Sequence, residues 1–118
     1  METNASIIEI SVANDFSNTP GGRYRSAGPY SGEEFREDFL EPRFNNLKQD
    51  QKIKVELDGC YGYPVSFLEE VFGGMIRKFD TNKVIERVLY HCSDEPSVES
   101  KIKQYINDAV KQKKGEII

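Results

Sequence analysis

The sequence predicts an α/β domain with a mixed β-sheet of about four strands and helices mainly on one face of the sheet. Segments of alternating apolar and polar residues, typical of strands, take turns along the chain with segments whose apolar residues recur at helical spacing. The strand segments alternate cleanly, whereas strands buried by helices on both faces form nearly continuous apolar runs. The length of 118 residues suits a single domain that spans the whole chain.

The first strand is expected at residues 6–13, whose apolar side chains alternate with polar ones. Residues 14–30 contain prolines and glycines that interrupt regular structure. Within this loop, residues 22–25 could still pair as a short strand.

A helix is expected to begin at Ser31, because Ser31 and Glu34 have the spacing of a capping box. Pro42 lacks a backbone donor and crowds the preceding turn, so the helix should either end near Leu40 or bend there and continue to Leu47. The apolar residues at helical spacing are Phe35, Phe39, Leu40, Phe44 and Leu47.

The second half of the chain repeats the alternation. A strand is expected at residues 52–58, and a second capping box, Ser66 to Glu69, predicts a helix to about Phe79. Residues 84–91 form the next expected strand, and a last helix should end near Lys114. Residues 111–118 are expected to fray as a solvated tail.

Composition excludes several classes of partner. The formal net charge of −4 opposes sequence-blind binding of nucleic acid. No apolar run is long enough to span a membrane, and the first residues lack the pattern of a signal peptide. We therefore expect a cytoplasmic protein without nucleic-acid or membrane partners, in which the two cysteines are free thiols.

Two glycines lie on the predicted helix that follows Ser66, on the face away from its apolar stripe. Each glycine costs about 1 kcal/mol relative to alanine in a helix interior, so this face should allow close approach of another backbone. That backbone could belong to a loop of the same chain or to a partner protein, or the helix could instead end at the glycines. The residues on this face are Ser66, Glu69, Glu70, Gly73, Gly74 and Arg77.

Ser66 has two interpretations. Capping the helix is a sufficient role for a serine at this position. The positive end of a helix dipole also favours an anion, so a phosphoryl group on Ser66 could be held there. It would face Glu69 and Glu70 and would alter docking by repulsion.

The glycine-rich loop that precedes the first helix is a second candidate site. Glycines allow close backbone approach, and arginines donate to phosphate groups in pairs of hydrogen bonds. The residues of this possible anion site are Arg23, Arg25, Gly28, Ser31 and Gly32. In the alternative interpretation, the arginines pair with nearby carboxylates.

Catalytic and metal chemistry is weakly supported. His91, Cys92 and Asp94 could meet Cys60 at the ends of neighbouring strands, but their spacing is not that of a zinc motif, so no metal or other cofactor is expected. The single histidine accompanies no recognisable nucleophile motif, which argues against an enzyme.

Four segments resemble the family of STAS-like domains of unknown function, and the likeness extends from about Phe16 to Ile76. The segments are Pro20-Gly-Gly-Arg-Tyr24, Gly28-Pro-Tyr-Ser-Gly-Glu33 with Phe35-Arg36, Val55-Glu-Leu-Asp-Gly59, and Ser66-Phe-Leu-Glu-Glu-Val-Phe-Gly-Gly74. In layout the chain is also similar to STAS domains of bacterial anti-sigma-factor antagonists.

The resemblance implies a non-enzymatic regulatory module that switches partners and docks a histidine-kinase-like ATPase or another regulatory protein. Asp58-Gly59 would match the strand end of the antagonists, and Ser66 would match their phosphorylated serine. The antagonists usually carry Asp-Ser-Ser-Gly where this chain has Pro64-Val65-Ser66-Phe67. The loss of the preceding Asp and the following Gly counts against phosphorylation of Ser66 and leaves docking possible. The implied docking residues are Asp58, Gly59, Tyr61, Tyr63, Glu69, Glu70, Gly73, Gly74 and Arg77.

Two further possibilities remain open at this point. An exposed strand edge could support a homodimer. A different class of function is a small-molecule or nucleotide sensor that binds an anion at the loop of residues 21–32.

Overall fold

The computed structural model describes residues 6–115, whose sheet contains three strands in the order β1-β2-β3. The strands are β1 (Ile7–Ser11), β2 (Lys52–Glu56) and β3 (Val88–His91). Both pairings are parallel, with Ile10 opposite Val55 and Val55 opposite Tyr90. Within the described residues the sheet is therefore three-stranded and parallel, which corrects the expected mixed sheet of about four strands.

Two long helical units pack on this sheet. The first, here called the 32–45 helix, consists of α1 (Gly32–Phe35), a wide π-type turn (Arg36–Leu40) and α2 (Glu41–Asn45). The second, the 65–78 helix, consists of α3 (Val65–Leu68), a π-type turn (Glu69–Gly73) and α4 (Gly74–Lys78). The remaining α-helices are α5 (Thr81–Arg87) and α6 (Pro96–Lys113). A π-type turn (Val12–Phe16) follows β1, so the strand expected at residues 6–13 ends at Ser11.

The 32–45 helix begins as predicted, because the hydroxyl oxygen of Ser31 accepts a hydrogen bond from the Glu34 N–H. The chain passes Pro42 without leaving the helix: the π-type turn ends at Leu40, and Pro42 occupies the first turn of α2, where a missing N–H is tolerated. The predicted apolar stripe is confirmed as part of the core, with Phe39 and Leu47 partly buried.

The 65–78 helix begins earlier than predicted. Pro64 is its N-cap, and the Ser66 side chain lies in the first turn and does not cap it. A proline has a fixed φ and no N–H, which suits a helix start and moves this start upstream of Ser66. The helix also continues through Gly73 and Gly74 and does not end there.

The prediction of a strand over residues 84–91 is wrong in its first half. The Asp80 carboxylate accepts a hydrogen bond from the Lys83 N–H and starts α5, so that only Val88–His91 is extended. Val84 and Val88 are both buried one helical turn apart, a spacing that also satisfies strand alternation. The loop expected at residues 14–30 contains a 3₁₀ turn at Arg25–Ala27, and the possible short strand at residues 22–25 does not form.

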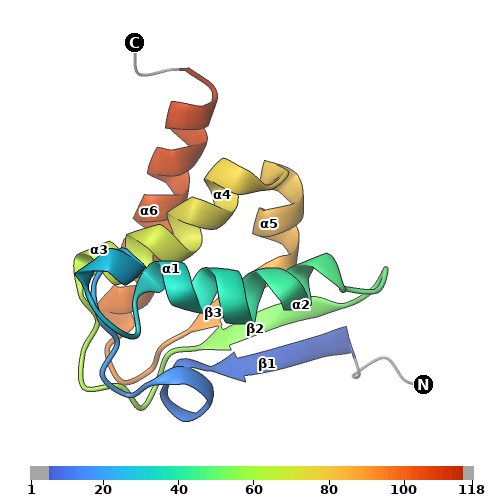
Figure 1. Ribbon diagram of the computed structural model, residues 1–118. Coiled ribbons are helices and arrows are strands. Elements are labelled where there is room, and N and C mark those ends of the chain that lie inside the picture. The colour runs from blue at the N-terminus through green and yellow to red at the C-terminus, as the bar shows by residue number, and fades with distance from the viewer. Residues whose placement is uncertain (1–5, 116–118) are drawn as a thin grey trace.

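The helices cover one face of the sheet, as predicted (Figure 1). Ile10, Ile53 and Val55 point into this covered face and are fully buried. Glu9 and Lys54 lie on the opposite, uncovered face and remain accessible. The carboxyl ends of the strands and the loops that follow them lie together at one edge of the sheet, on the left in Figure 1.

The last helix ends at Lys113, close to the predicted end, and the expected tail from Lys111 overlaps its final turn. Residues 116–118 of that tail lie outside the described residues. Cys60 and Cys92 are free thiols, as predicted. Among residues 6–115, no helix is both long and apolar enough to cross a bilayer.

Candidate functional site

The glycine-bearing face of the 65–78 helix does not face solvent. Gly73 and Gly74 are both buried. A Cβ atom added to Gly74 would lie 2.5 Å from Nε and 2.9 Å from Cδ of Arg36, which belongs to the 32–45 helix. A Cβ atom added to Gly73 would meet the side chains of Glu69 and Arg77. The close approach inferred from the glycines is therefore made by side chains of the same chain, and the expectation that another backbone lies against this face is wrong.

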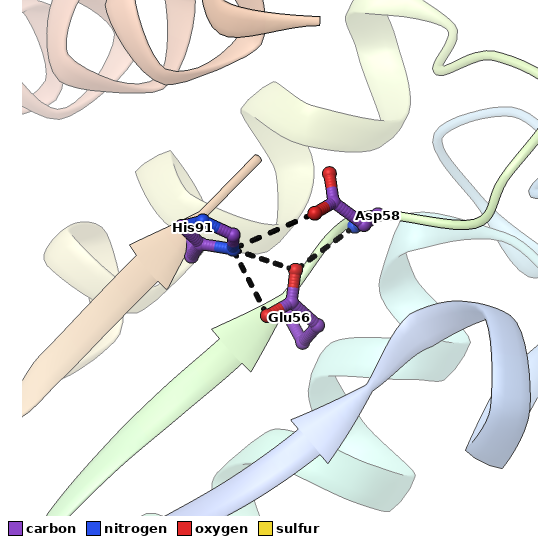
Figure 2. A group of neighbouring side chains, drawn as sticks. All are labelled: Glu56, Asp58 and His91. Atoms are coloured by element: carbon purple, nitrogen blue, oxygen red, sulfur yellow. Dashed lines mark hydrogen bonds and ion pairs between the residues drawn. The ribbon is translucent and has the colours of Figure 1, made fainter. Parts of the chain in front are cut away.

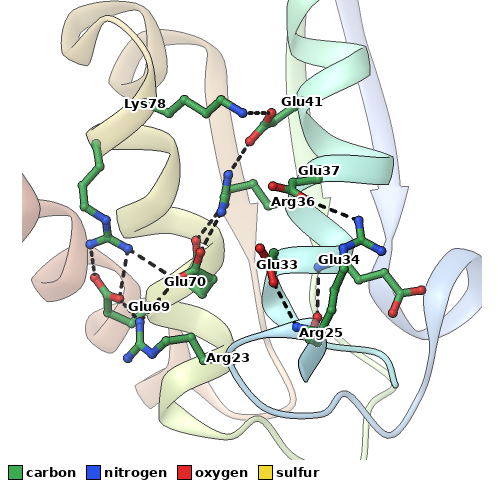
Figure 3. Close-up of polar contacts among 12 residues, drawn as sticks. Arg23, Arg25, Glu33, Glu34, Arg36, Glu37, Glu41, Glu69, Glu70 and Lys78 are labelled. Carbon is green, nitrogen blue, oxygen red and sulfur yellow. Dashed lines mark hydrogen bonds and ion pairs between the residues drawn. The ribbon is translucent and has the colours of Figure 1, made fainter. Parts of the chain in front are cut away.

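Arg36 is the centre of a buried ion cluster between the two long helices (Figure 3). Its guanidinium donates to Glu70 Oε2 at 2.6 Å, to the Glu70 backbone carbonyl at 3.1 Å, and to the carboxylate of Glu41. Lys78 Nζ lies 2.9 Å from the other oxygen of Glu41. Burial opposes the charged form of Arg36, but its hydrogen bonds to Glu70 and Glu41 outweigh burial and raise its pKa. Glu70 is thus an internal partner of Arg36 and is only 6% exposed.

The arginines of the glycine-rich loop are also paired (Figure 3). Arg23 donates to the carboxylate of Glu69 and ties the loop to the 65–78 helix. Arg25 Nη2 lies 2.9 Å from Asp38 Oδ1 and 3.3 Å from Glu37 Oε1. These contacts support the interpretation in which the arginines pair with carboxylates.

The other residues of the suggested anion site have structural roles as well. The Ser31 hydroxyl caps the 32–45 helix. Gly32 is buried where that helix crosses the 65–78 helix, and a Cβ atom there would lie 2.7 Å from the carbonyl oxygen of Phe67. Gly28 adopts a φ of 134°, a conformation that residues with a Cβ atom rarely reach.

Asp58 anchors the loop that follows β2. Its carboxylate accepts hydrogen bonds from the N–H groups of Ser93 and Asp94 at 2.7 and 2.8 Å, and from the Ser93 hydroxyl at 2.6 Å. The backbone N–H of Asp94, the Ser93 donors and nearby His91 lower the pKa of Asp58 to about 2. The Gly59 N–H in turn donates to the Asp94 carboxylate at 2.8 Å. Asp58 therefore fixes the start of the loop against the β3–α6 connection.

The rest of this loop presents apolar side chains to solvent. Tyr63 is held back, because its hydroxyl donates to the Leu57 carbonyl at 2.7 Å. Tyr61 is 86% exposed and Val65 is 58% exposed. The Tyr61 N–H donates to the Asn18 carbonyl at 3.0 Å, which places this loop beside the glycine-rich loop.

Two more exposed aromatic residues, Tyr24 and Tyr30, lie on that neighbouring loop. We call the four exposed residues Tyr24, Tyr30, Tyr61 and Val65 the loop surface. Four of the six large apolar side chains that are exposed in residues 6–115 belong to it, and the other two are Ile7 and Ile85. Val65 ends the segment 59–65 that the resemblance implied for docking, and it is the first residue of α3. Tyr24 and Tyr30 were not expected as docking residues, because periodicity gives no signal for exposure within a loop.

Ser66 lies next to the loop surface. It is partly exposed in the first turn of the 65–78 helix, and its hydroxyl makes no hydrogen bond within residues 6–115. Glu69 and Glu70, the carboxylates expected to repel a phosphoryl group there, are both paired with arginine side chains.

A further polar cluster lies at the carboxyl ends of β2 and β3 (Figure 2). His91 Nδ1 lies 2.8 and 2.9 Å from the two carboxylate oxygens of Glu56 and 3.7 Å from Asp58 Oδ2. The hydrogen bond to Glu56 and the charges of Glu56 and Asp58 raise the pKa of His91. The partners expected for His91 were Cys92, Asp94 and Cys60, but Cys92 is buried and Cys60 bonds to Tyr63. The alternation of β2 placed Glu56 on the polar face, and the register that brings it opposite His91 was not visible in the sequence.

The fold is that of a small α/β domain with exposed loops at the carboxyl ends of its strands. A family model described as a STAS-like domain of unknown function matches residues 31–97. The chain belongs to this family, as the sequence resemblance predicted. No curated protein and no solved structure matches the chain.

Proposed function

We propose that the chain is a non-enzymatic regulatory module that acts in the cytoplasm by docking a histidine-kinase-like ATPase. The docking surface is the loop surface together with the loop after Asp58 and the first turn of the 65–78 helix. The observation that carries the proposal is that four of the six large apolar side chains exposed in residues 6–115 lie on two loops joined by the Tyr61–Asn18 hydrogen bond or on the helix start that follows; they are Tyr24, Tyr30, Tyr61 and Val65. Aromatic residues are enriched at the energetic centres of protein interfaces.

Burial decides which of the expected docking residues can belong to the proposed surface. Gly74 and Glu70 are internal and face Arg36 of the other long helix, and Gly73 is buried under side chains of its own helix. Among the docking residues implied by the resemblance, those that solvent reaches are Asp58, Gly59, Tyr61, Tyr63, Glu69 and Arg77. Asp58 and Tyr63 are anchored to neighbouring backbone, so the loop is presented in a fixed shape and loses little entropy on binding.

The position of Ser66 supports phosphorylation as the switch. An ATPase of this class would transfer the γ-phosphoryl group of ATP to the Ser66 oxygen, releasing ADP and the hydroxyl proton. The added charge would lie at the positive end of the 65–78 helix, where it is tolerated. It would also add two negative charges beside Val65 and Tyr61, and so weaken an apolar contact with the partner.

The non-enzymatic part of the proposal is supported by the state of the nucleophilic side chains. Burial raises the pKa of the Cys60 thiol, and its contact with the Tyr63 hydroxyl does not reverse this. Burial also raises the pKa of Cys92. Neither thiol is the low-pKa thiolate of a catalytic cysteine. Two unpaired cysteines also suit a reducing compartment.

Capture from a lysate of the source organism tests the docking proposal. Immobilised wild-type chain should retain an ATP-binding protein of the histidine-kinase-like class, and Tyr61→Asp should reduce recovery by about tenfold or more, the effect of losing one interface anchor. Ile85→Asp is the matched control, because Ile85 is exposed on α5 outside the loop surface. Equal recovery by wild type and Tyr61→Asp would refute this docking surface.

Incubation with the captured ATPase and ATP tests the switch separately. We expect one phosphoryl group on wild type, located at Ser66 by peptide mass spectrometry, and none on Ser66→Ala. Phosphorylation should then lower the affinity for the ATPase. A complex that forms without any modification of Ser66 would remove the switch and leave the docking proposal standing.

A further inference from the structure

We infer that Glu56, Asp58 and His91 form a binding site for a divalent transition-metal cation of the zinc type. The site lies at the carboxyl ends of β2 and β3, the edge at which parallel α/β sheets commonly bind ligands (Figure 2). It is independent of the proposed docking function and can fail or stand without it.

The donor set suits such a cation. One imidazole nitrogen and carboxylate oxygens from two acidic residues lie within 4.8 Å of one another, so that a single ion can contact all three side chains. Imidazole nitrogen and carboxylate oxygen are ordinary zinc ligands at about 2.0 to 2.2 Å. A neutral imidazole also distinguishes the site from the all-oxygen sets that Mg²⁺ and Ca²⁺ prefer.

The three ligands come from rigid parts of the fold. Glu56 and His91 occupy paired positions of the parallel ladder, so the sheet fixes their spacing. The Glu56 carboxylate is oriented by the Asp58 N–H at 3.1 Å. Asp58 is oriented by three donors from Ser93 and Asp94, and Oδ2, the oxygen nearer His91, accepts only the Ser93 hydroxyl among them. This leaves a lone pair of Oδ2 for a metal, and such supporting hydrogen bonds are characteristic of metal sites.

Charge and access favour a cation as well. The cluster lies on the sheet face that no helix covers, and the His91 side chain is 43% exposed. Glu56 and Asp58 line an open pocket together with two further carboxylates, Glu9 and Asp94. Lys54 partly balances these charges, with its Nζ 3.3 Å from Glu9 Oε1 and 3.6 Å from Glu56 Oε1. An entering divalent cation would take over this balancing role at Glu56, with water completing its coordination.

Titration of the tag-free chain with Zn²⁺ tests the inference, with His91 as an internal reporter because it is the only histidine in the sequence. We expect saturable binding by calorimetry and a matching shift of the ¹H–¹⁵N imidazole signals of His91. His91→Ala and the isosteric Glu56→Gln should each weaken binding by about tenfold or more, the usual effect of damage to a metal site. Glu86→Gln, which removes an exposed carboxylate of α5, is the matched control and should leave binding unchanged.

Absence of saturation, or binding of Zn²⁺ without a shift of the His91 signals, would overturn the inference. So would equal affinity in wild type and Glu56→Gln. Because none of these measurements uses a protein partner, their failure says nothing about docking of the ATPase.

Discussion

Gly73 and Gly74 are neighbours in one helix, but the side chains that pack against them differ in how easily they can move. Gly74 lies under Nε and Cδ of Arg36, whose guanidinium is buried and held by Glu70 and Glu41. Gly73 lies under the far ends of Glu69 and Arg77, two long side chains that solvent reaches. A methyl group at Gly73 can therefore push the ends of Glu69 and Arg77 aside easily. A methyl group at Gly74 can displace Arg36 only by breaking the ion cluster.

This difference predicts opposite effects of alanine at the two positions. Gly74→Ala should lower the free energy of unfolding by about 1 to 3 kcal/mol, the usual cost of overpacking, even though alanine favours helix. Gly73→Ala should be neutral or stabilising by up to about 1 kcal/mol. Urea denaturation of both variants measures the difference. Equal stability of the two would mean that Arg36 is not held as described.

Glu69 makes the free energy of unfolding depend on pH in the acidic range. Burial raises the pKa of Glu69, but hydrogen bonds from Arg77 and Arg23 outweigh burial and lower it below the ordinary 4.5. A carboxyl group with a lowered folded-state pKa stabilises the fold above its unfolded pKa, and this contribution disappears as pH falls through the folded value.

Wild type should therefore be more stable than Glu69→Gln at pH 7, by about 1 kcal/mol or less because the paired side chains are partly exposed to solvent. The difference should shrink below about pH 4.5 and vanish in stronger acid. Thermal melts of both proteins across this range test the sign. A difference that grows as pH falls would contradict the pairing of Glu69 with the two arginines.

At the scale of elements, the 32–45 and 65–78 helices are joined by the Arg36 cluster as well as by apolar packing. Gly32 against Phe67 and Gly74 against Arg36 let the two helices approach closely. Removing one member of a buried ion cluster leaves the opposite charge without a partner, which costs about 3 to 5 kcal/mol.

We accordingly expect Arg36→Met to lose about 3 kcal/mol of unfolding free energy, because buried Glu70 loses its nearest partner and keeps only Arg23 at 3.4 Å and Arg77 at 3.6 Å. The double variant Arg36→Met with Glu70→Met should lose less than Arg36→Met alone, since it buries no unpaired charge. A double variant whose loss equals the sum of the two single losses would show that the residues are not coupled.

The 32–45 helix and the 81–91 segment differ in how well the sequence predicts their secondary structure. The 32–45 helix was predictable because Ser31 and the apolar stripe agree with each other. The 81–91 segment was not, because the spacing of Val84 and Val88 fits a helix and a strand alike, and the Asp80 cap decides between them. The glycine pair indicated that some group lies close to this face, but the expected backbone is absent: side chains cover both glycines, and only the tertiary structure identifies Arg36 at Gly74.

At the scale of the whole molecule, the helices bury one face of the sheet and leave the other face accessible to solvent. The polar face of β2 correctly predicted helices on one side of the sheet. The order of the strands then brings Glu56 opposite His91, a pairing between residues far apart in sequence that no local pattern records. Likewise, the loop surface draws on two segments that are distant in sequence, and the hydrogen bond from the Tyr61 N–H to the Asn18 carbonyl joins them.

Hydrogen exchange of the chain, alone and in complex with the captured ATPase, tests the central claim most directly. Backbone amides of residues 59–65 and of the neighbouring loop around Tyr24 and Tyr30 should exchange more slowly in the complex, while those of α5 should be unchanged. Protection confined to α5, α6 or the uncovered face of the sheet, with residues 59–65 unaffected, would contradict the account.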